Sequence, residues 1–132
     1  MARRVGTLRY AAYAAASCCP RKATTLPWIT YDETMAHLPQ ARWITAAVRN
    51  GESIAAIRVA DAENLIEAVA AGIGRSLLPC LIADADARLR RLNARRHATL
   101  PARELWLLRH SDLKRLARIE AVIEWIEQIA PH

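Results

Sequence analysis

The sequence predicts an α/β domain, mainly because of the stretch Arg58–Pro79. A β-prone run ends at Val59, a helix-like segment follows, and a second short apolar run at Ser76–Leu78 stops at a proline. The apolar residues of the middle segment recur at helical spacing. They are Leu65, Ile66, Val69 and Ile73. A strand, a helix and a strand in this order are typical of a parallel crossover connection, because parallel strands need a long return path.

Polar residues and glycines mark the two ends of this helix. Asp61 stands at the N-cap position, where its carboxylate can accept hydrogen bonds from the first turn, and Glu63 adds favourable negative charge there. Gly72 suits the left-handed residue that ends a helix. The pair Gly72 and Gly74 has the spacing of a nucleotide-binding turn, but it follows a helix instead of preceding one. We therefore interpret these glycines as a helix stop.

The N-terminal segment allows two interpretations. An arginine-rich start followed by an alanine-rich run up to Cys18 resembles an export signal. Arg9 interrupts the apolar run, however, and the alternation of apolar and polar residues favours a strand. We expect this strand around Leu8 and Tyr10, which alternate with Thr7 and Arg9. The polar stretch Pro20–Pro27 that follows indicates turns.

Two further strands and a helix are expected before Arg58. Trp28–Tyr31 and Ile54–Val59 are rich in the aromatic and β-branched residues that strands prefer. Between them, Asp32–Thr34 forms a polar loop or the start of a helix, and Pro39 suits the first turn of a helix. The apolar side of that helix is formed by Trp43, Ile44, Ala47 and Val48. Asn50 and the glycine after it indicate a turn.

The C-terminal third continues the pattern. Cys80–Ala85 suits a short helix, and Leu105–Leu108 suits a strand. The basic stretch Arg88–His97 is either an anion or DNA contact or an edge strand and loop protected by charge, and we favour the edge strand. A final helix begins at Ser111 or Asp112. Its apolar face comprises Leu113, Leu116, Ile119, Val122, Ile123, Ile126 and Ile129.

Composition limits the class of protein. The chain has 132 residues, 53% of them hydrophobic, which suits one folded domain. Its net charge of +6 permits contact with nucleic acid, but we favour a solvated arginine-rich surface, because basic charge alone identifies no partner. No apolar run reaches the length of a membrane span. We expect a cytoplasmic protein in which Cys18, Cys19 and Cys80 are reduced and packed, since the adjacent pair lacks further metal ligands nearby in sequence.

No catalytic motif is found in the sequence. The four histidines lack the spacing that places two metal ligands on one helix face. The sequence also contains no Walker loop and no nucleophile elbow. Asp84 and Asp86 could form a carboxylate pair, although such a pair more often makes a helix end soluble. We expect no enzyme activity, no metal and no cofactor.

Several segments together resemble the effector-binding domain of LysR-type transcriptional regulators. They are VGTLRYAAYA, LPWITYD, RVADAENLIEAVAAGIGRSLLP and ELWLLRHSDLKRLARIEAVIEWI, in this order, from about Gly6 to Ile129. The resemblance implies a fold similar to type 2 periplasmic binding proteins, with two lobes joined by two crossing strands. Leu8–Ala14 and Leu105–Arg109 would be these strands. Residues 15–103 would form the second lobe, whereas residues 2–14 and 104–132 would be remnants of the first.

The chain also departs from the family. A full regulator begins with a winged helix-turn-helix domain, a linker helix and most of the first lobe, and none of these is found in residues 1–132. We therefore expect a partial effector-binding domain that would reach DNA only through a missing N-terminal domain. The expected function is small-molecule effector sensing for a bacterial regulator. The alternative is a protein-interaction or oligomerisation fragment without a ligand, because the apolar face of the last helix would drive self-association.

Candidate ligand contacts lie after the carboxyl ends of two expected strands, at Thr30–Thr34 and Ala60–Asn64. Backbone N–H groups at Asp32–Thr34 would suit a carboxylate, which the resemblance implies for many effectors, so an organic acid is one expected class. The spacing explains Asp61 fully as a helix cap alone, and we favour that interpretation. Trp106 on the second crossing strand could line the cleft, but we favour a position in the core. The candidate effector contacts are Tyr31, Asp32, Thr34, Asp61, Asn64 and Trp106.

Overall fold

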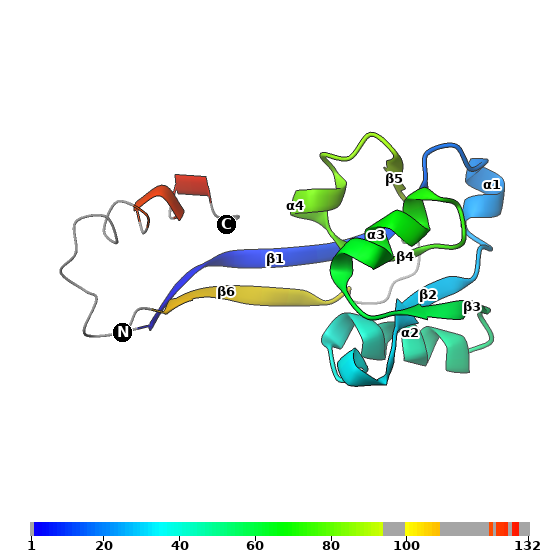
Figure 1. The fold of residues 1–132 in the computed structure, drawn as a ribbon, viewed down its shortest axis with the longest axis horizontal. Helices are drawn as coiled ribbons and strands as arrows, with labels where there is room; N and C mark the ends of the chain where they lie inside the picture. Colours follow the sequence, from blue (N-terminus) through cyan, green and yellow to red (C-terminus); the bar gives the residue numbers. More distant parts are fainter. Residues whose placement is uncertain (1, 94–99, 109–121, 123, 127, 130–132) are drawn as a thin grey trace. The chain divides into compact units, whose positions relative to one another are not determined.

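The computed structural model describes residues 2–93, 100–108, 122, 124–126 and 128–129. The chain divides into two compact units, one formed by Met1–Leu8 with Ala102–His132 and the other by Arg9–Pro101. Strand β1, Ala2–Ala15, contributes residues to both units (Figure 1).

The larger unit contains a mixed set of strands. Strands β4 (Ser76–Pro79) and β5 (Leu89–Arg91) both pair antiparallel with β1. Strands β2 (Trp28–Tyr31) and β3 (Ile54–Val59) pair in parallel. A parallel bridge between Trp28 and Arg75 connects β2 to the residue just before β4. The strands therefore follow one another in the order β3, β2, β4, β1, β5.

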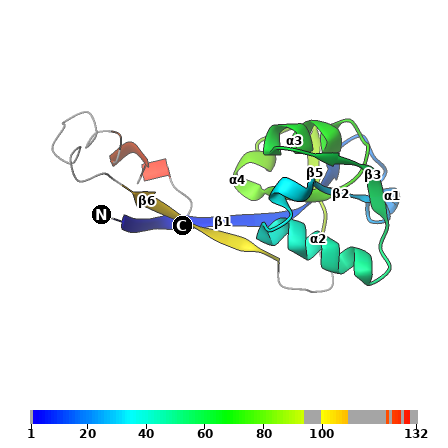
Figure 2. The same ribbon diagram turned by 60° about the horizontal axis from the view of Figure 1, so that its bottom comes forward.

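Helices connect these strands. Helix α2 (Pro39–Arg49) joins β2 to β3, and helix α3 (Ala62–Ala70) joins β3 to β4. The two helices lie on opposite sides of the β2–β3 pair (Figures 1 and 2). Three short helical segments complete the unit, namely α1 (Pro20–Ala23), η1 (Glu33–Met35) and α4 (Cys80–Ala83).

The core lies between the helices and the central strands. Ile29 and Val69 are fully buried, and Leu65 is 1% exposed. In β1, every residue from Tyr10 to Ala15 is buried. The alternation of apolar and polar residues that predicts a strand near Leu8 therefore ends within β1. From Tyr10 on, both faces of the strand are covered, as is usual for a central strand. The alanines of this run leave space for the larger side chains of the neighbouring elements.

A close approach between Gly74 and the chain before β2 brings β4 beside β2. A Cβ atom on Gly74 would lie 2.4 Å from the carbonyl oxygen of Pro27 and 2.9 Å from Cγ1 of Ile29. In the next residue, the Arg75 backbone N–H donates to Pro27 O at 2.9 Å, and Arg75 O accepts from Ile29 N at 2.8 Å. The buried Ser76 hydroxyl adds a 2.7 Å hydrogen bond to the carbonyl oxygen of Ile29. Only glycine permits this contact at position 74.

The Arg75 side chain reinforces the same junction. Its guanidinium carbon lies 4.2 Å from the centre of the Trp28 ring, and its Nε donates to Leu26 O at 2.9 Å. Nη2 pairs with Glu52 at 2.9 Å, and Glu52 also accepts a 3.3 Å hydrogen bond from the Trp28 indole. Burial lowers the pKa of Arg75, and Glu52 opposes this shift. The arginine stays charged, and its contacts connect the starts of β2, β3 and β4.

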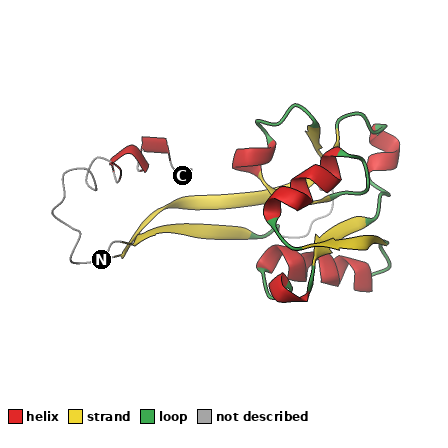
Figure 3. Cartoon of the chain, in the orientation of Figure 1, coloured by secondary structure: helices red, strands yellow, loops and turns green. Residues whose placement is uncertain are grey.

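The smaller unit is built on a pair of strands. The N-terminal part of β1 pairs with β6, Ala102–Leu108 (Figure 3). On this pair, Arg4 lies 3.6 Å from Glu104 and donates to the Thr7 hydroxyl at 2.8 Å. Leu105 and Leu107 are half-buried. The described large apolar side chains that are exposed in this unit are Trp106, Val122, Trp125 and Ile129.

Most local predictions are confirmed. The strands at Trp28–Tyr31, Ile54–Val59 and Ser76–Leu78 are present. Asp61 accepts a 2.8 Å hydrogen bond from Asn64 N, as an N-cap should, and Gly72 has a φ of 85° after α3. The expected turn residue Gly51 has a φ of 102°.

Other predictions need correction. The first strand is longer than Leu8–Ala14, and the expected turns at Pro20–Pro27 include helix α1. Ile73 is 45% exposed because α3 ends before it. Cys19 is exposed instead of packed, since it lies in the turn before α1. The start of the last helix, at Ser111 or Asp112, lies outside the described residues.

Replacing Gly74 with alanine should destabilise the larger unit. The added methyl group meets a backbone carbonyl, which cannot move aside as a flexible side chain could, so we expect a loss of about 1–3 kcal/mol in unfolding free energy. Urea denaturation monitored by circular dichroism measures it. Ile73→Ala, next in sequence and exposed, is the control and should change the unfolding free energy by less than about 0.5 kcal/mol. Equal denaturation midpoints for Gly74→Ala and the wild type would contradict the assigned role.

Candidate functional site

The carboxyl ends of β2 and β3 lie side by side. The two strands are parallel, with Tyr31 opposite Val59, and the Asp32 N–H donates to the Val59 carbonyl at 2.8 Å. Consequently the segment that follows β2 and the segment that begins α3 leave the sheet at the same edge. This edge combines loops with helix starts, which is where open α/β sheets bind ligands.

Asp32 serves as the cap of η1. Its Oδ1 accepts hydrogen bonds from the Thr34 N–H at 3.0 Å and the Thr34 hydroxyl at 2.5 Å. Asp32 is half-buried, whereas Thr34 and Glu33 are exposed. The carboxylate therefore has a structural role of its own, independent of any ligand.

Asp61 has the equivalent role at α3. Its two carboxylate oxygens accept from the Asn64 N–H at 2.8 Å and from the Asn64 side-chain amide at 3.0 Å. Both residues are exposed. These two hydrogen bonds support the interpretation of Asp61 as a helix cap.

The N–H groups expected to bind a carboxylate are largely engaged within the chain. Of those at Asp32–Thr34, the Asp32 N–H is bonded to Val59 and the Thr34 N–H to the Asp32 carboxylate. Glu33 and Glu63 add exposed negative charge at the same two segments. The electrostatic environment of this edge therefore disfavours an anionic group.

The remaining two candidates differ from these. Tyr31 is only 6% exposed and packs in the hydrophobic core, so it supports the end of β2 from inside the domain. Trp106 belongs to the smaller unit, where it is 53% exposed and its indole N–H donates to Glu104 at 3.2 Å. The core interpretation of Trp106 is therefore wrong. The carboxyl ends of β2 and β3 carry all the candidates except Trp106, namely Tyr31, Asp32, Thr34, Asp61 and Asn64.

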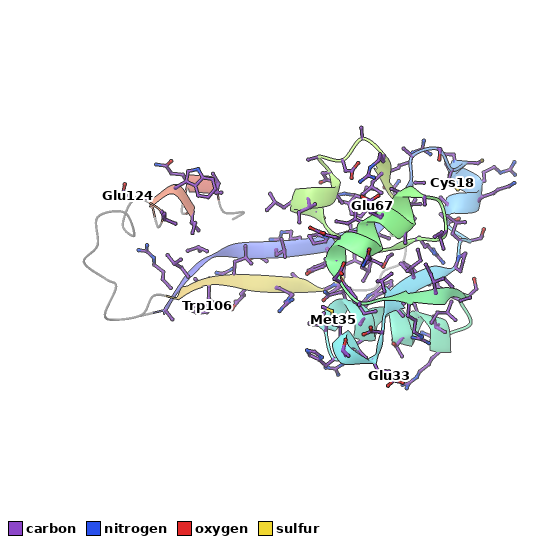
Figure 4. The ribbon with its side chains drawn as sticks, in the orientation of Figure 1. Cys18, Glu33, Met35, Glu67, Trp106 and Glu124 are labelled. Carbon is purple, nitrogen blue, oxygen red and sulfur yellow. The ribbon has the colours of Figure 1, made fainter. Side chains whose placement is uncertain are left out.

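A third strand end reaches the same edge and was missed in the sequence. Strand β4 runs alongside β2 in the same direction, so Pro79 and Cys80 emerge beside the segment after β2. The connection after β2 leads to one face of the sheet and the connection after β3 to the other. In open α/β sheets, ligands bind at such a reversal. Figure 4 shows Glu33 and Met35 on the segment that follows β2. The sequence marks the end of β4 with a proline but does not indicate which strand lies beside it.

A polar cluster lies next to this third strand end. The buried Tyr13 hydroxyl donates to Asp84 Oδ1 at 2.5 Å, and Arg91 pairs with Asp84 Oδ2. Burial and the bond to Asp84 raise the pKa of Tyr13, whereas the bonds from Arg91 and Tyr13 lower the pKa of Asp84. The cluster links β1, α4 and β5.

Asp84 and Asp86 do not form a carboxylate pair for acid–base chemistry. Asp86 is bonded to Arg88, which lowers the pKa of the aspartate, and Arg88 also pairs with Glu67 at 2.9 Å. General acid catalysis by a carboxyl group needs a raised pKa, so neither group suits that role.

The described part of the basic stretch forms an edge strand, as favoured from the sequence. Strand β5 ends the sheet beside β1, and its arginines have partners within the chain. Arg91 pairs with Asp84, while Arg90 donates to the carbonyl oxygens of Ala16 and Cys18 at 2.9 and 3.1 Å. These arginines hold the fold together instead of presenting a free anion-binding face. Residues 94–97 of the stretch lie outside the described residues.

In the part of the chain that the structure describes, no group of three histidine, cysteine, aspartate or glutamate side chains could hold a metal ion. Within the same ranges we find no helix with the length and apolar character needed to cross a bilayer. Of the four histidines, His37 alone lies among the described residues.

Comparisons with known proteins identify similar domains. A family model described as the LysR substrate binding domain matches residues 2–130. The C-terminal domains of a LysR family protein from Agrobacterium tumefaciens share 24% identity at a TM-score of 0.63, covering 100% of this chain and 69% of that one. The regulatory domain of CrgA, a LysR-type transcriptional regulator from Neisseria meningitidis, shares 15% identity at a TM-score of 0.67, with coverage of 97% and 67%.

A further similar structure contains a ligand. The regulatory domain of CcmR from Synechocystis PCC6803 was solved in complex with 2-PG and shares 10% identity at a TM-score of 0.60, with coverage of 98% and 66%. No curated protein matches the sequence. At these identities the solved structures show the fold, and the family model carries the family assignment.

Removing the Tyr13 hydroxyl should change both stability and its pH dependence. Tyr13→Phe should lose about 1–2 kcal/mol, because a hydrogen bond to a charged group disappears. The raised pKa of folded Tyr13 contributes stability that is complete below about pH 10, where unfolded tyrosine is neutral, and is lost as the pH rises further. Urea denaturation from pH 7 to 11 should show this loss in the wild type and not in the variant.

Two aspartate variants provide the control for this effect. Asp84→Asn should weaken the alkaline loss, whereas Asp86→Asn should leave it as in the wild type, since Asp86 contacts Arg88 and not Tyr13. The same alkaline loss in Tyr13→Phe as in the wild type would show that another group is responsible.

Proposed function

The chain belongs to the LysR substrate binding domain family, and we propose that it senses a small-molecule effector for a LysR-type transcriptional regulator. Domains of this family are regulatory. The observation that carries the proposal is the common edge at which β2, β3 and β4 end, with α2 and α3 leaving to opposite faces. Open α/β sheets bind their ligands at edges of this kind. Among the described residues, no pair of groups suited to acid–base catalysis lies beside this edge.

The larger unit is proposed as the second lobe of the effector domain. On this assignment, β1 and β6 are the two crossing strands that the resemblance implies. The predicted division at residues 15–103 and the compact unit Arg9–Pro101 support treating this part as one body that binds and moves together. Contact with DNA is assigned to the winged helix domain of such regulators and not to these residues. The cytoplasm is the proposed location.

The effector contacts are assigned to the polar groups at the strand ends. Thr34 and Asn64 are exposed and stand on the first turns of η1 and α3. Asp32 and Asp61 position them through the cap hydrogen bonds and retain oxygen lone pairs for a ligand donor. Tyr31 supports this surface from the core.

The charges at this edge define what part of the effector meets it. With Asp32, Glu33, Asp61 and Glu63 on the two segments, hydroxyl or amino groups are preferred over a carboxylate. An organic acid, the class expected from the resemblance, would therefore present its hydroxyl or amino substituents to these strand ends. Hydroxy acids and amino acids satisfy both requirements.

The proposed switch is a change in population between two arrangements of the effector domain. An effector shifts such an equilibrium only by the difference in its affinity for the two arrangements. Caps at Asp32 and Asp61 hold the contact residues in place before binding, so that little free energy is lost in ordering them.

Self-association is proposed as a second property of the chain. It rests on the exposed side chains of the smaller unit, which include Trp106 at 53% and Trp125 at 60%. Exposed aromatic residues of this size are typical of interaction surfaces.

Thermal denaturation with a panel of hydroxy acids, amino acids, amines and simple carboxylates tests the sensing role. A ligand at about 100 times its Kd should stabilise the protein by about 2.7 kcal/mol. Thr34→Val and Asn64→Ala should weaken binding of the same ligand about tenfold, the usual effect of losing one hydrogen bond. Thr25→Val is the matched control, because Thr25 lies before β2 and its hydroxyl bonds only Lys22 O among the described contacts. If no member of the panel binds, or if Thr34→Val and Asn64→Ala bind as the wild type does, the assigned site is wrong.

Sedimentation velocity tests self-association. We expect the wild type to sediment as a species larger than the 14.7 kDa monomer, and Trp125→Ser to shift it toward the monomer. Leu81→Ser is the control, since Leu81 is 55% exposed on α4 of the other unit. A wild-type chain that stays monomeric at every concentration would exclude this property and leave the sensing role untouched.

A further inference from the structure

The turn between β1 and α1 carries two adjacent cysteines that the proposed function does not use. Both are free thiols, Cys19 exposed and Cys18 half-buried. Figure 4 labels Cys18. They precede α1 and β2 in the chain, whereas Asp32 follows β2. Any chemistry of these thiols is therefore separate from the strand-end site.

The backbone around the two thiols is held from both sides. The Cys18 N–H donates to Ala15 O at 3.0 Å, and Arg90 of β5 donates to Cys18 O at 3.1 Å. On the other side, the carbonyl of Cys19 accepts from Lys22 N at 3.0 Å and Ala23 N at 2.9 Å. The turn is consequently fixed in position before any ligand arrives, which reduces the entropy lost on binding.

The adjacency of the two cysteines in the sequence favours a bridging atom over a direct bond. Cys18 Sγ lies 3.6 Å from the carbonyl oxygen of Cys19, so its sulfur is turned toward the next residue. Adjacent Cα atoms are about 3.8 Å apart, which is shorter than the roughly 4.4–6.8 Å of ordinary disulfides. Two sulfurs bound at about 2.3 Å to one tetrahedral centre are themselves about 3.8 Å apart. For two adjacent cysteines, a single soft atom is therefore a better bridge between the sulfurs than a direct bond.

The number of ligands decides the kind of soft atom. Thiolates select soft centres, but a structural zinc ion needs four ligands, and the described residues contain no group of three metal-ligating side chains. A monosubstituted trivalent arsenical forms three bonds and supplies one of them itself. It therefore needs two sulfurs, which is the number that this turn offers.

We propose that Cys18 and Cys19 form a surface site for monosubstituted trivalent arsenicals. Two S–H bonds break and two S–As bonds form, while arsenic releases its oxygen as water. Arsenic remains trivalent, so the reaction needs no oxidant or reductant. The proposal does not depend on effector sensing, because the thiols and the strand-end residues share no contact among the described hydrogen bonds.

Phenylarsine oxide tests the proposal on the full chain under reducing-agent-free conditions. Intact mass spectrometry should show one phenylarsenic adduct per wild-type chain, removed by a small dithiol and retained in an equal concentration of a monothiol. Cys18→Ser and Cys19→Ser should each weaken binding by roughly tenfold or more, since one sulfur cannot hold the arsenic alone. Cys80→Ser is the matched control and should bind as the wild type does.

The outcomes separate cleanly. Absence of the adduct from the wild type overturns the proposal, as does loss of the adduct in Cys80→Ser alone. An adduct retained equally by all three variants also overturns it, because binding would then need no defined pair. Circular dichroism of each serine variant verifies that the fold is intact, and a denatured wild-type sample that binds no tighter than the single variants confirms that the held turn matters.

Discussion

The contact of Gly74 and Arg75 with the segment before β2 determines how the strands of the larger unit are joined. The β2–β3 pair and the β4–β1–β5 group are two sheets, and this contact places them side by side. The absent side chain at Gly74 allows the two backbones to meet, and Arg75 holds them with its bonds to Leu26 and Glu52. Because this junction aligns the starts of the strands, it also aligns their carboxyl ends at the opposite edge. The geometry of the candidate site thus depends on a contact at the far end of the same strands.

Local signals in the sequence predict local structure well. Asp61 and Gly72 are marked by residue types that suit the two ends of a helix, and both positions behave accordingly. Ile73 shows where such reasoning fails, since helical spacing alone does not say that the helix has already ended. Helix α1 is too short to give a periodic pattern. The close packing at Gly74 involves residues distant in sequence, so a glycine interpreted as a helix stop has a second role there.

The candidate site was predictable as a place but not as a chemical environment. The rule that ligands bind beyond strand ends indicates the segments after Tyr31 and Val59, and the parallel pairing brings them together. Which N–H groups are already bonded depends on the turn that the chain adopts, so the engagement of the Asp32 and Thr34 N–H groups required the structure. The contribution of Cys80 depends on the strand order. Strand order follows from long-range contacts that no local pattern records.

The register of β1 has a consequence for the order of events during synthesis. Tyr10 pairs with Pro79, and Tyr13 pairs with both Ser76 and Arg91. Strand β1 therefore leaves the ribosome well before β4 and β5, the neighbours with which it pairs. Long-range pairing of this kind is slow, and an unpaired, alanine-rich strand is exposed to other chains in the meantime. The arginines near its start, Arg3, Arg4 and Arg9, give the nascent strand a repulsive charge during that interval.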